Sequence, residues 1–187
     1  MTPMLGIMAS QISGHLVTGA FDSIATVSPT TAPSTITFSS IPGTYKHLQI
    51  RGIVRTNVGG TVDNLNMRCN SDSGSNYTYH YLTGNGASAT VASGLTQTSM
   101  FPIRAPGNGG TASTFGAFVI DILDYADTNK YKTARSLSGQ DQNSANGDLF
   151  FFSSLWMNTA AITNLEIGFA AGGIMNNSTF ALYGIKG

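Results

Sequence analysis

Charged residues are rare in this sequence and their signs balance, which excludes two classes of protein. The 187 residues include nine Lys and Arg against nine Asp and Glu, so the formal net charge is zero. Charged residues make up 10% of the chain, compared with roughly 25% in an average soluble domain. Nucleic-acid binding requires a basic surplus, and intrinsic disorder combines low hydrophobicity with high net charge. We therefore expect neither a nucleic-acid partner nor a disordered chain.

Cysteine is nearly absent, and targeting signals and long apolar runs are missing. Cys69 is the single cysteine, which excludes a disulfide scaffold, and its place in an alternating segment predicts a buried thiol. No Lys or Arg precedes Asp22, so the charged start of a secretory signal is lacking. No stretch reaches the ~20 apolar residues that span a bilayer. We expect synthesis in a cytosol, with no signal peptide and no membrane insertion.

Small neutral polar residues and 22 glycines take the place of the missing charge. A protein without net charge tends to associate, because little electrostatic repulsion keeps its copies apart. A subunit whose surface is covered in a permanent assembly tolerates this composition better than a free monomer does. The composition therefore favours a homo-oligomer.

Alternation of apolar and polar residues dominates the chain from Asp22 onward. Segments of this kind, separated by turn residues, predict strands at 23–28, 34–40, 46–56, 64–70, 77–83, 115–123, 131–138, 149–157, 162–169 and 178–185. Short strands at regular spacing predict an all-β fold, an antiparallel, jelly-roll-like β-sandwich over residues 21–187. The adjacent Ile53 and Val54 break the alternation after Gly52, which predicts a β-bulge there.

Residues 1–20 differ from the rest because they are mainly apolar and contain no Lys, Arg, Asp or Glu. An exposed apolar segment usually packs against something. We therefore predict an N-terminal docking arm that contacts a neighbouring copy or another protein; the alternative is a frayed leader. The expected docking residues are Met4, Leu5, Ile7, Met8, Ile12 and Leu16.

The stretch from Thr83 to Ser113 is long, polar and rich in small residues, with one apolar cluster at Met100, Phe101 and Ile103. A long irregular stretch inside a domain is usually a functional loop or an interface segment. We therefore predict that these three residues form an oligomer interface. The alternative is one more core strand, because short apolar runs are ambiguous.

No motif typical of catalysis or metal binding is present. His15, His47 and His80 lack the spacing of metal ligands. Residues 70–76 carry alternate oxygen side chains, as in a calcium loop, but Glu166 is the only glutamate and lies far downstream, so a hairpin turn is favoured. No G-x-S-x-G elbow occurs. We predict no enzyme activity, no catalytic residue, no cofactor and no metal.

Aromatic residues are the remaining candidates for ligand binding. Tyr77, Tyr79 and Tyr81 alternate with Thr78 and His80, so the three tyrosines share one face of a predicted strand. An exposed row of this kind would stack on the sugar rings of a glycan, whereas an inward row would belong to the core. The sequence favours the core and keeps glycan contact as the alternative.

Five phrases carry a resemblance to a known group of proteins. They are MLGIMASQISG at 4–14, FSSIPGTYKHLQI at 38–50, NSDSGSNY at 70–77, DYADTNKYK at 124–132 and FALYGI at 180–185. Together, and in this order along nearly the whole chain, they resemble small virion structural proteins of tailed bacteriophages, especially cyanophages and marine phages.

This resemblance implies a β-sandwich building block located in a virion and made in the host cytoplasm. Such proteins are identified as tail-fibre or appendage proteins, or simply as structural proteins. We expect a fibre or appendage subunit, a homotrimer that is anchored to other virion proteins by the arm of residues 1–20. Contact with a host surface glycan would serve host attachment. The resemblance carries no catalytic motif. A capsid decoration or cement protein is the alternative, and a free carbohydrate-binding module is a further alternative from another class.

Overall fold

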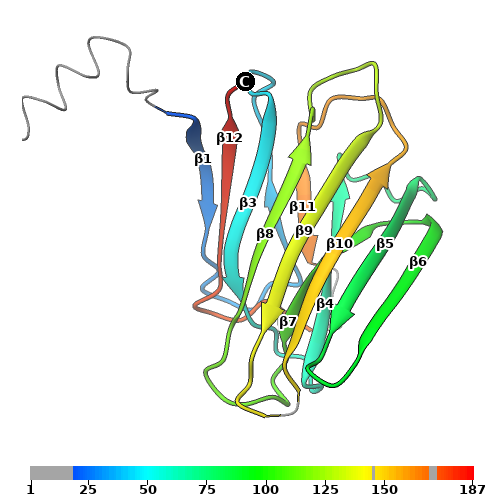
Figure 1. The fold of residues 1–187 in the computed structure, drawn as a ribbon. Coiled ribbons are helices and arrows are strands. Elements are labelled where there is room, and N and C mark those ends of the chain that lie inside the picture. Colours follow the sequence, from blue (N-terminus) through cyan, green and yellow to red (C-terminus); the bar gives the residue numbers. More distant parts are fainter. Residues whose placement is uncertain (1–18, 145, 169–171) are drawn as a thin grey trace, which may run out of the picture.

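The computed structural model describes residues 19–144, 146–168 and 172–187, and every regular element in these ranges is a strand. The strands form two antiparallel sheets packed face to face, which confirms the predicted jelly-roll-like β-sandwich (Figure 1). The predicted arm of residues 1–20 lies almost entirely outside the described residues. In chain order the strands are β1 (Phe21–Val27), β2 (Thr35–Phe38), β3 (His47–Val54), β4 (Val62–Cys69), β5 (Tyr77–Gly84), β6 (Ala89–Gln97), β7 (Met100–Pro106), β8 (Gly116–Leu123), β9 (Lys132–Gln140), β10 (Asp148–Trp156), β11 (Leu165–Gly168) and β12 (Thr179–Ile185).

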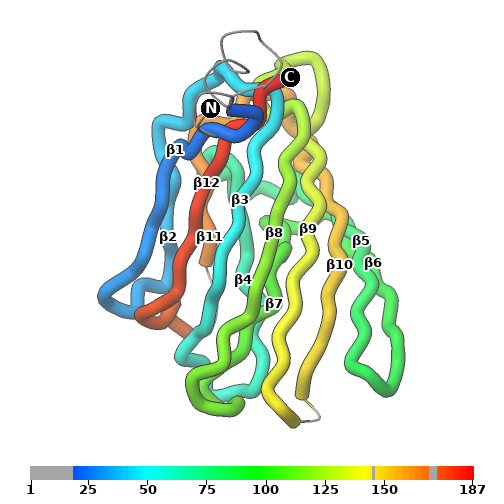
Figure 2. Tube along the Cα trace, turned by 60° about the vertical axis from the view of Figure 1, so that its left-hand side comes forward, coloured from blue at the N-terminus to red at the C-terminus, as the bar shows by residue number. Residues whose placement is uncertain are grey.

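The larger sheet has eight strands in the order β1-β12-β3-β8-β9-β10-β5-β6, and Figure 2 shows them side by side from one edge to the other. The smaller sheet has the order β2-β11-β4-β7 and covers one face of the larger sheet. Strand β7 lies against β8, β9 and β10, whereas β6 has β5 as its main neighbour. The hairpin of β5 and β6 therefore extends beyond the cover that the smaller sheet provides.

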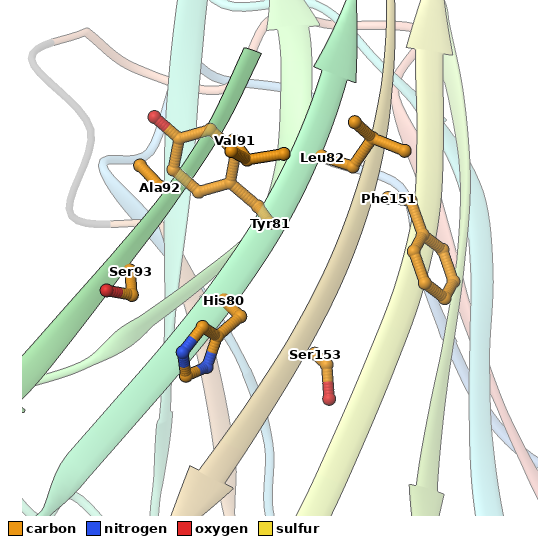
Figure 3. Close-up of a pocket in the computed structure, with 8 residues that line it drawn as sticks. All are labelled: His80, Tyr81, Leu82, Val91, Ala92, Ser93, Phe151 and Ser153. Atoms are coloured by element: carbon orange, nitrogen blue, oxygen red, sulfur yellow. The ribbon is translucent and has the colours of Figure 1, made fainter. Parts of the chain in front are cut away.

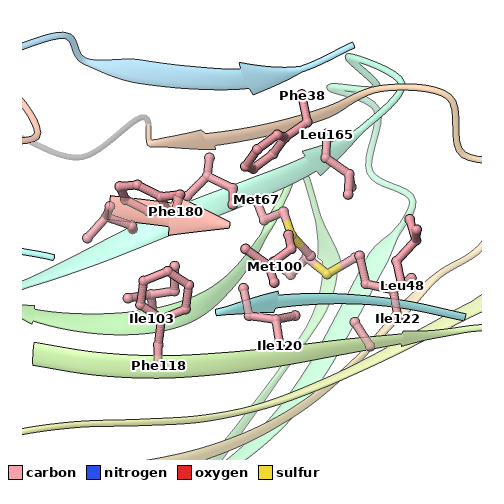
Figure 4. Close-up of a cluster of buried hydrophobic side chains, with 14 of the residues drawn as sticks. Phe38, Leu48, Met67, Met100, Ile103, Phe118, Ile120, Ile122, Leu165 and Phe180 are labelled. Carbon is pink, nitrogen blue, oxygen red and sulfur yellow. The ribbon is translucent and has the colours of Figure 1, made fainter. Parts of the chain in front are cut away.

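Apolar side chains from both sheets meet in one core between them (Figure 4). Met67 and Met100 of the smaller sheet lie in this layer with Leu48 and Ile120 of the larger one. Burial alternates along each central strand, as period-two geometry requires. The predicted buried thiol of Cys69 is part of the same core.

Strand β10 shows how the alternation sorts three consecutive phenylalanines. Phe150 and Phe152 point into the core and are buried, so Phe151 between them must point to the opposite face of the sheet. Phe151 is 49% exposed. The sequence therefore places a large aromatic side chain on the outer face of the larger sheet.

The polar stretch from Thr83 to Ser113 is not an irregular segment, contrary to our expectation. It contains β6, from Ala89 to Gln97, and β7, from Met100 to Pro106. Strand β6 is exposed on both faces, and so it lacks the apolar–polar alternation that marks a half-buried strand. Strand β7 contains two prolines, which a strand tolerates at a sheet edge, and β7 is an edge strand.

The predicted β-bulge at Gly52 is wrong. Residues 47–53 pair continuously with β12, and residues 48–54 pair continuously with β8. A Cβ atom at position 52 would lie 1.9 Å from the carbonyl oxygen of Thr179 and 2.9 Å from Cζ of Phe118. The glycine is therefore required because β12 and Phe118 approach the backbone closely, and it leaves the register unchanged.

Candidate functional site

The loop of residues 70–76 is a turn but not the predicted hairpin, because it joins β4 of the smaller sheet to β5 of the larger sheet and these two strands do not pair. One carboxylate oxygen of Asp72 accepts hydrogen bonds from Trp156 Nε1 at 2.8 Å and from Asn76 Nδ2 at 2.9 Å. The other oxygen accepts one from the backbone N–H of Gly74 at 2.8 Å. Burial would raise the pKa of Asp72, but these three hydrogen bonds together hold it below its ordinary value. Both oxygens of the Asp72 carboxylate thus accept hydrogen bonds that stabilise the fold.

Two buried cationic side chains, Lys132 and Arg55, donate hydrogen bonds to backbone oxygens of their own chain. Lys132 Nζ donates to the backbone oxygens of Lys130 at 2.8 Å, of Thr159 at 3.0 Å and of Asp127. Burial lowers the pKa of Lys132. Arg55 donates to backbone oxygens of the loop at 110–114, including that of Thr111 at 2.6 Å. Both cations fasten loops to strands, which is a structural role.

The described residues contain no group of three or more His, Cys, Asp and Glu side chains that could hold a metal ion. His47 Nδ1 accepts a hydrogen bond from the backbone N–H of Asp124 at 3.0 Å, which fixes its orientation at the end of β3. His80 lies on the outer face of β5 and is exposed. His15 falls outside the described residues. Nowhere in the described ranges is there a helix with the length and apolarity needed to cross a membrane.

The three tyrosines of β5 point toward the inside of the sandwich, as the core interpretation expected. Tyr77 is completely buried and stacks on Trp156 at a centroid distance of 6.4 Å. Tyr79 and Tyr81 are half-buried, because the smaller sheet does not extend over the whole of β5. Both contact Phe101 of β7 edge to face, at 4.4 Å and 6.0 Å. The rings of Tyr79 and Tyr81 therefore pack against each other and against core side chains.

Met100 and Ile103, which we predicted at an oligomer interface, lie in the core of their own chain. They are 1% and 0% exposed. Phe101 is half-buried against the rings of Tyr79, Tyr81 and the inner phenylalanines of β10. A second copy could reach Met100 or Ile103 only after the sandwich had opened. The alternative of a core strand describes this cluster correctly.

Exposed apolar side chains that could contact a partner lie instead on the outer face of the larger sheet. Direct cross-strand pairing places five apolar residues in one row: Val91 of β6, Leu82 of β5, Phe151 of β10, Leu137 of β9 and Val119 of β8. Two residues further along the strands a second row holds Leu149, Ala117 and Ile53. We call these eight residues the Phe151 patch.

The large side chains of the Phe151 patch are substantially exposed to solvent. Val91 is 73% exposed, Leu149 59%, and Leu82, Leu137, Phe151 and Ile53 are each between 45% and 49%. Single exposed apolar residues are normal, but a row of apolar residues that runs unbroken across five strands is not.

A polar row borders the Phe151 patch on the opposite side from Leu149. It runs through Ser93, His80, Ser153, Arg135 and Asp121. The Arg135 Nε and Asp121 Oδ2 atoms are 3.3 Å apart, so these charges already neutralise each other.

A shallow hollow of about 430 Å³ lies where the apolar and polar rows meet on β10, β5 and β6 (Figure 3). Leu82, Val91 and Phe151 supply apolar lining, and His80, Ser93 and Ser153 supply polar groups. A second, smaller hollow of about 170 Å³ lies between Leu82 and Leu149. The outer face of the larger sheet therefore has depressions in addition to its exposed apolar area.

Sequence reasoning missed the Phe151 patch, although one signal for it was present. Three consecutive phenylalanines cannot all point inward from a strand, so the middle one had to point to the opposite face of the sheet. The remaining members come from strands paired far apart in sequence, and no local pattern shows that they adjoin.

The comparisons with known proteins add little to this geometry. No family model matches the chain, and no curated protein matches it. Among solved structures, the crystal structure of the Caenorhabditis elegans galectin LEC-6 is similar over 89% of this chain and 98% of that chain, with 11% identity and a TM-score of 0.35. At this TM-score the similarity supports no statement about ligands or partners.

Proposed function

We propose that this chain is a non-enzymatic structural subunit of a bacteriophage virion, a fibre or appendage protein that works through its surfaces. The observation that carries the proposal is the Phe151 patch, an exposed apolar surface. The polar groups of Asp72, Lys132 and Arg55 are engaged in hydrogen bonds that hold the fold together. The resemblance of five sequence phrases to phage virion proteins supplies the setting.

In this proposal the subunit forms a homo-oligomer, a trimer, and residues 1–20 dock on another virion protein. The zero net charge of the chain supports permanent association, because little electrostatic repulsion keeps neighbouring copies apart. The capsid decoration protein remains the alternative within the same class, since it would use the same kinds of surface.

Mass spectrometry of purified particles of the phage that encodes the chain tests this function. We expect the chain to co-purify with intact virions and to be counted in tens of copies or fewer. Hundreds of copies would indicate a decoration protein instead. Absence from purified particles would reject the virion proposal in both forms.

The hollow beside Phe151 favours one second candidate, a carbohydrate-binding module. An exposed aromatic ring with hydrogen-bonding neighbours is the combination that holds a sugar ring, and His80, Ser93 and Ser153 provide such neighbours. A glycan array with the purified chain tests this candidate. Binding that disappears in both Phe151→Ala and His80→Ala would support it, and the absence of any bound glycan would reject it.

A further inference from the structure

We infer that the Phe151 patch is the surface through which copies of this chain bind one another. The inference deepens the proposed function, since it names the contact that a self-associating subunit would use. It replaces the expectation that Met100, Phe101 and Ile103 form the interface, because two of those side chains are buried in their own core.

The size of the patch fits a protein–protein contact. A fully exposed aromatic side chain presents about 150–250 Å² and an aliphatic one somewhat less. The six large side chains of the patch are about half exposed on average, so they present roughly 500–600 Å² between them. That is the upper end of the ~300–600 Å² of the largest apolar patch on a typical monomer. A standard interface buries about 800 Å² on each partner. The patch with its polar border supplies an area of this order.

The arrangement also matches the anatomy of an interface, in which an apolar centre is surrounded by a polar rim. The two apolar rows form the centre, and the row from Ser93 to Asp121 forms the rim. Two sheets pack face to face about 10 Å apart, with side chains of one filling depressions in the other. The hollows beside Phe151 and Leu149 are depressions that Leu or Phe side chains of an opposing sheet would enter.

The lack of charge on the patch favours another copy of this chain as the partner. The patch itself contains no charged residue, and the charged groups at its border are engaged within the chain. Arg135 pairs with Asp121, and the guanidinium of Arg51 lies over the ring of Phe21, 5.0 Å from its centroid. Such a surface offers nothing to attract phosphates of nucleic acids or lipid headgroups. It suits a neutral, apolar sheet face, and this chain presents one itself. Because the same patch would meet on both copies, the contact has two-fold symmetry and joins copies in pairs, so it is a contact beyond those that close a trimer.

The patch continues to an edge strand that lacks the usual protection. Strand β6 is one of the two edge strands of the larger sheet, and its nine residues include neither a charged residue nor a proline. Native proteins generally place charges or prolines on such edges to prevent uncontrolled pairing. The chain itself therefore does not protect this edge, which fits a strand that lies within a contact between copies.

Light scattering and sedimentation of the purified full chain over a concentration series test the inference. We expect the wild type to associate and Phe151→Asp to be at least about 100-fold weaker in self-association, because a carboxylate would be buried in an apolar contact. The matched control is Ser23→Asp, which adds the same charge at an exposed position on β1, at the far edge of the same sheet. Circular dichroism checks that both variants keep the β fold.

Chemical protection provides a second measurement that does not depend on a disruptive charge. Because Cys69 is buried, a cysteine introduced at Leu137 or Ser23 would be the reactive thiol of the chain. Maleimide labelling of Leu137→Cys should slow at least tenfold as the protein concentration rises, whereas labelling of Ser23→Cys should not change.

A wild-type monomer at high micromolar concentration would overturn the inference, as would an oligomer unaffected by Phe151→Asp with Leu137→Cys still accessible. These results concern the purified chain alone. They would leave the virion location untouched, which is decided by particle composition; conversely, absence from particles would leave the self-association result standing.

Discussion

The indole Nε1–H of Trp156 donates a hydrogen bond to Oδ2 of Asp72 at 2.8 Å, joining the end of β10 to the turn between β4 and β5. Trp156 is 1% exposed, so water cannot replace the carboxylate as its acceptor. The tyrosine that opens β5, Tyr77, also donates its hydroxyl to the backbone oxygen of Asp72 at 3.1 Å. One turn residue thereby holds two of the largest buried aromatic side chains.

Replacing Asp72 should therefore destabilise the sandwich. Asp72→Ala leaves the buried indole N–H without an acceptor, which costs about 1–3 kcal/mol, and the Tm should fall by about 2–10 °C. The matched control is Asp141→Ala. Asp141 accepts the backbone N–H of Asn143 at 2.8 Å in an exposed turn but holds no buried group. Calorimetry should show a clearly larger loss for Asp72; equal losses would mean that the Trp156 contact contributes nothing.

Acid should destabilise the fold through carboxylates whose pKa is depressed in the native state. Hydrogen bonds from Lys130 and then Lys46 lower the pKa of Asp124 from its ordinary 3.8 to about 2. A depressed pKa means that the stabilisation is complete above the unfolded value and disappears as the pH falls through the folded value. Urea midpoints should thus decline between about pH 4 and pH 2. The decline should be smaller in Asp124→Asn, and an unchanged slope in that variant would contradict the assignment.

Gly52→Ala should weaken the larger sheet where β12 crosses close to β3. The added Cβ would lie 1.9 Å from the backbone oxygen of Thr179, so strands must separate, at a cost of about 1–3 kcal/mol or more. Gly43→Ala is the control, because a Cβ at that position meets nothing within 4 Å. Chemical denaturation should show a loss for position 52 and a change within about 0.5 kcal/mol for position 43.

Cys69 should be inert until the protein unfolds. Burial raises the pKa of its thiol, and nearby Asp72 raises it further, so the reactive thiolate is suppressed. A thiol-exchange reagent should detect no thiol in the native protein and one per chain in denaturant. Rapid reaction under native conditions would show that the core around Cys69 opens readily.

Deleting residues 1–18 tests the predicted docking arm. The described sandwich begins with β1 at Phe21, so the truncated chain should keep its strands and its Tm. If residues 1–20 dock on another virion protein, the truncated chain should not be incorporated into particles. Competition between full-length and truncated chains during phage assembly measures this directly, and equal incorporation would reject the arm.

Local patterns were sufficient to predict the sandwich and most strands, because alternation such as that of Leu65, Met67 and Cys69 follows directly from which face is buried. They were insufficient for β6 and β7. Strand β6 has no buried face to produce alternation, and the prolines at 102 and 106 argue against a strand unless its edge position is known.

The candidate site was harder to predict than the fold because it depends on strand order. Leu82 and Phe151 are 69 positions apart in the sequence, yet they pair directly across β5 and β10. Leu137 adjoins Phe151 through a second pairing, with β9. Only the register brings these residues into one row, so the sequence pattern directed attention to the compact cluster at Met100, Phe101 and Ile103 instead.

The order of strands in the larger sheet also determines when the molecule can fold. Strand β1 pairs with β12, from Phe21 opposite Ile185 to Val27 opposite Phe180, and β12 separates β1 from β3. During synthesis, β1 therefore has no neighbour until residues 179–185 have left the ribosome. Closing so long a loop is slow. The larger sheet is complete only when this strand has paired, so until then β1 of the nascent chain has no partner strand.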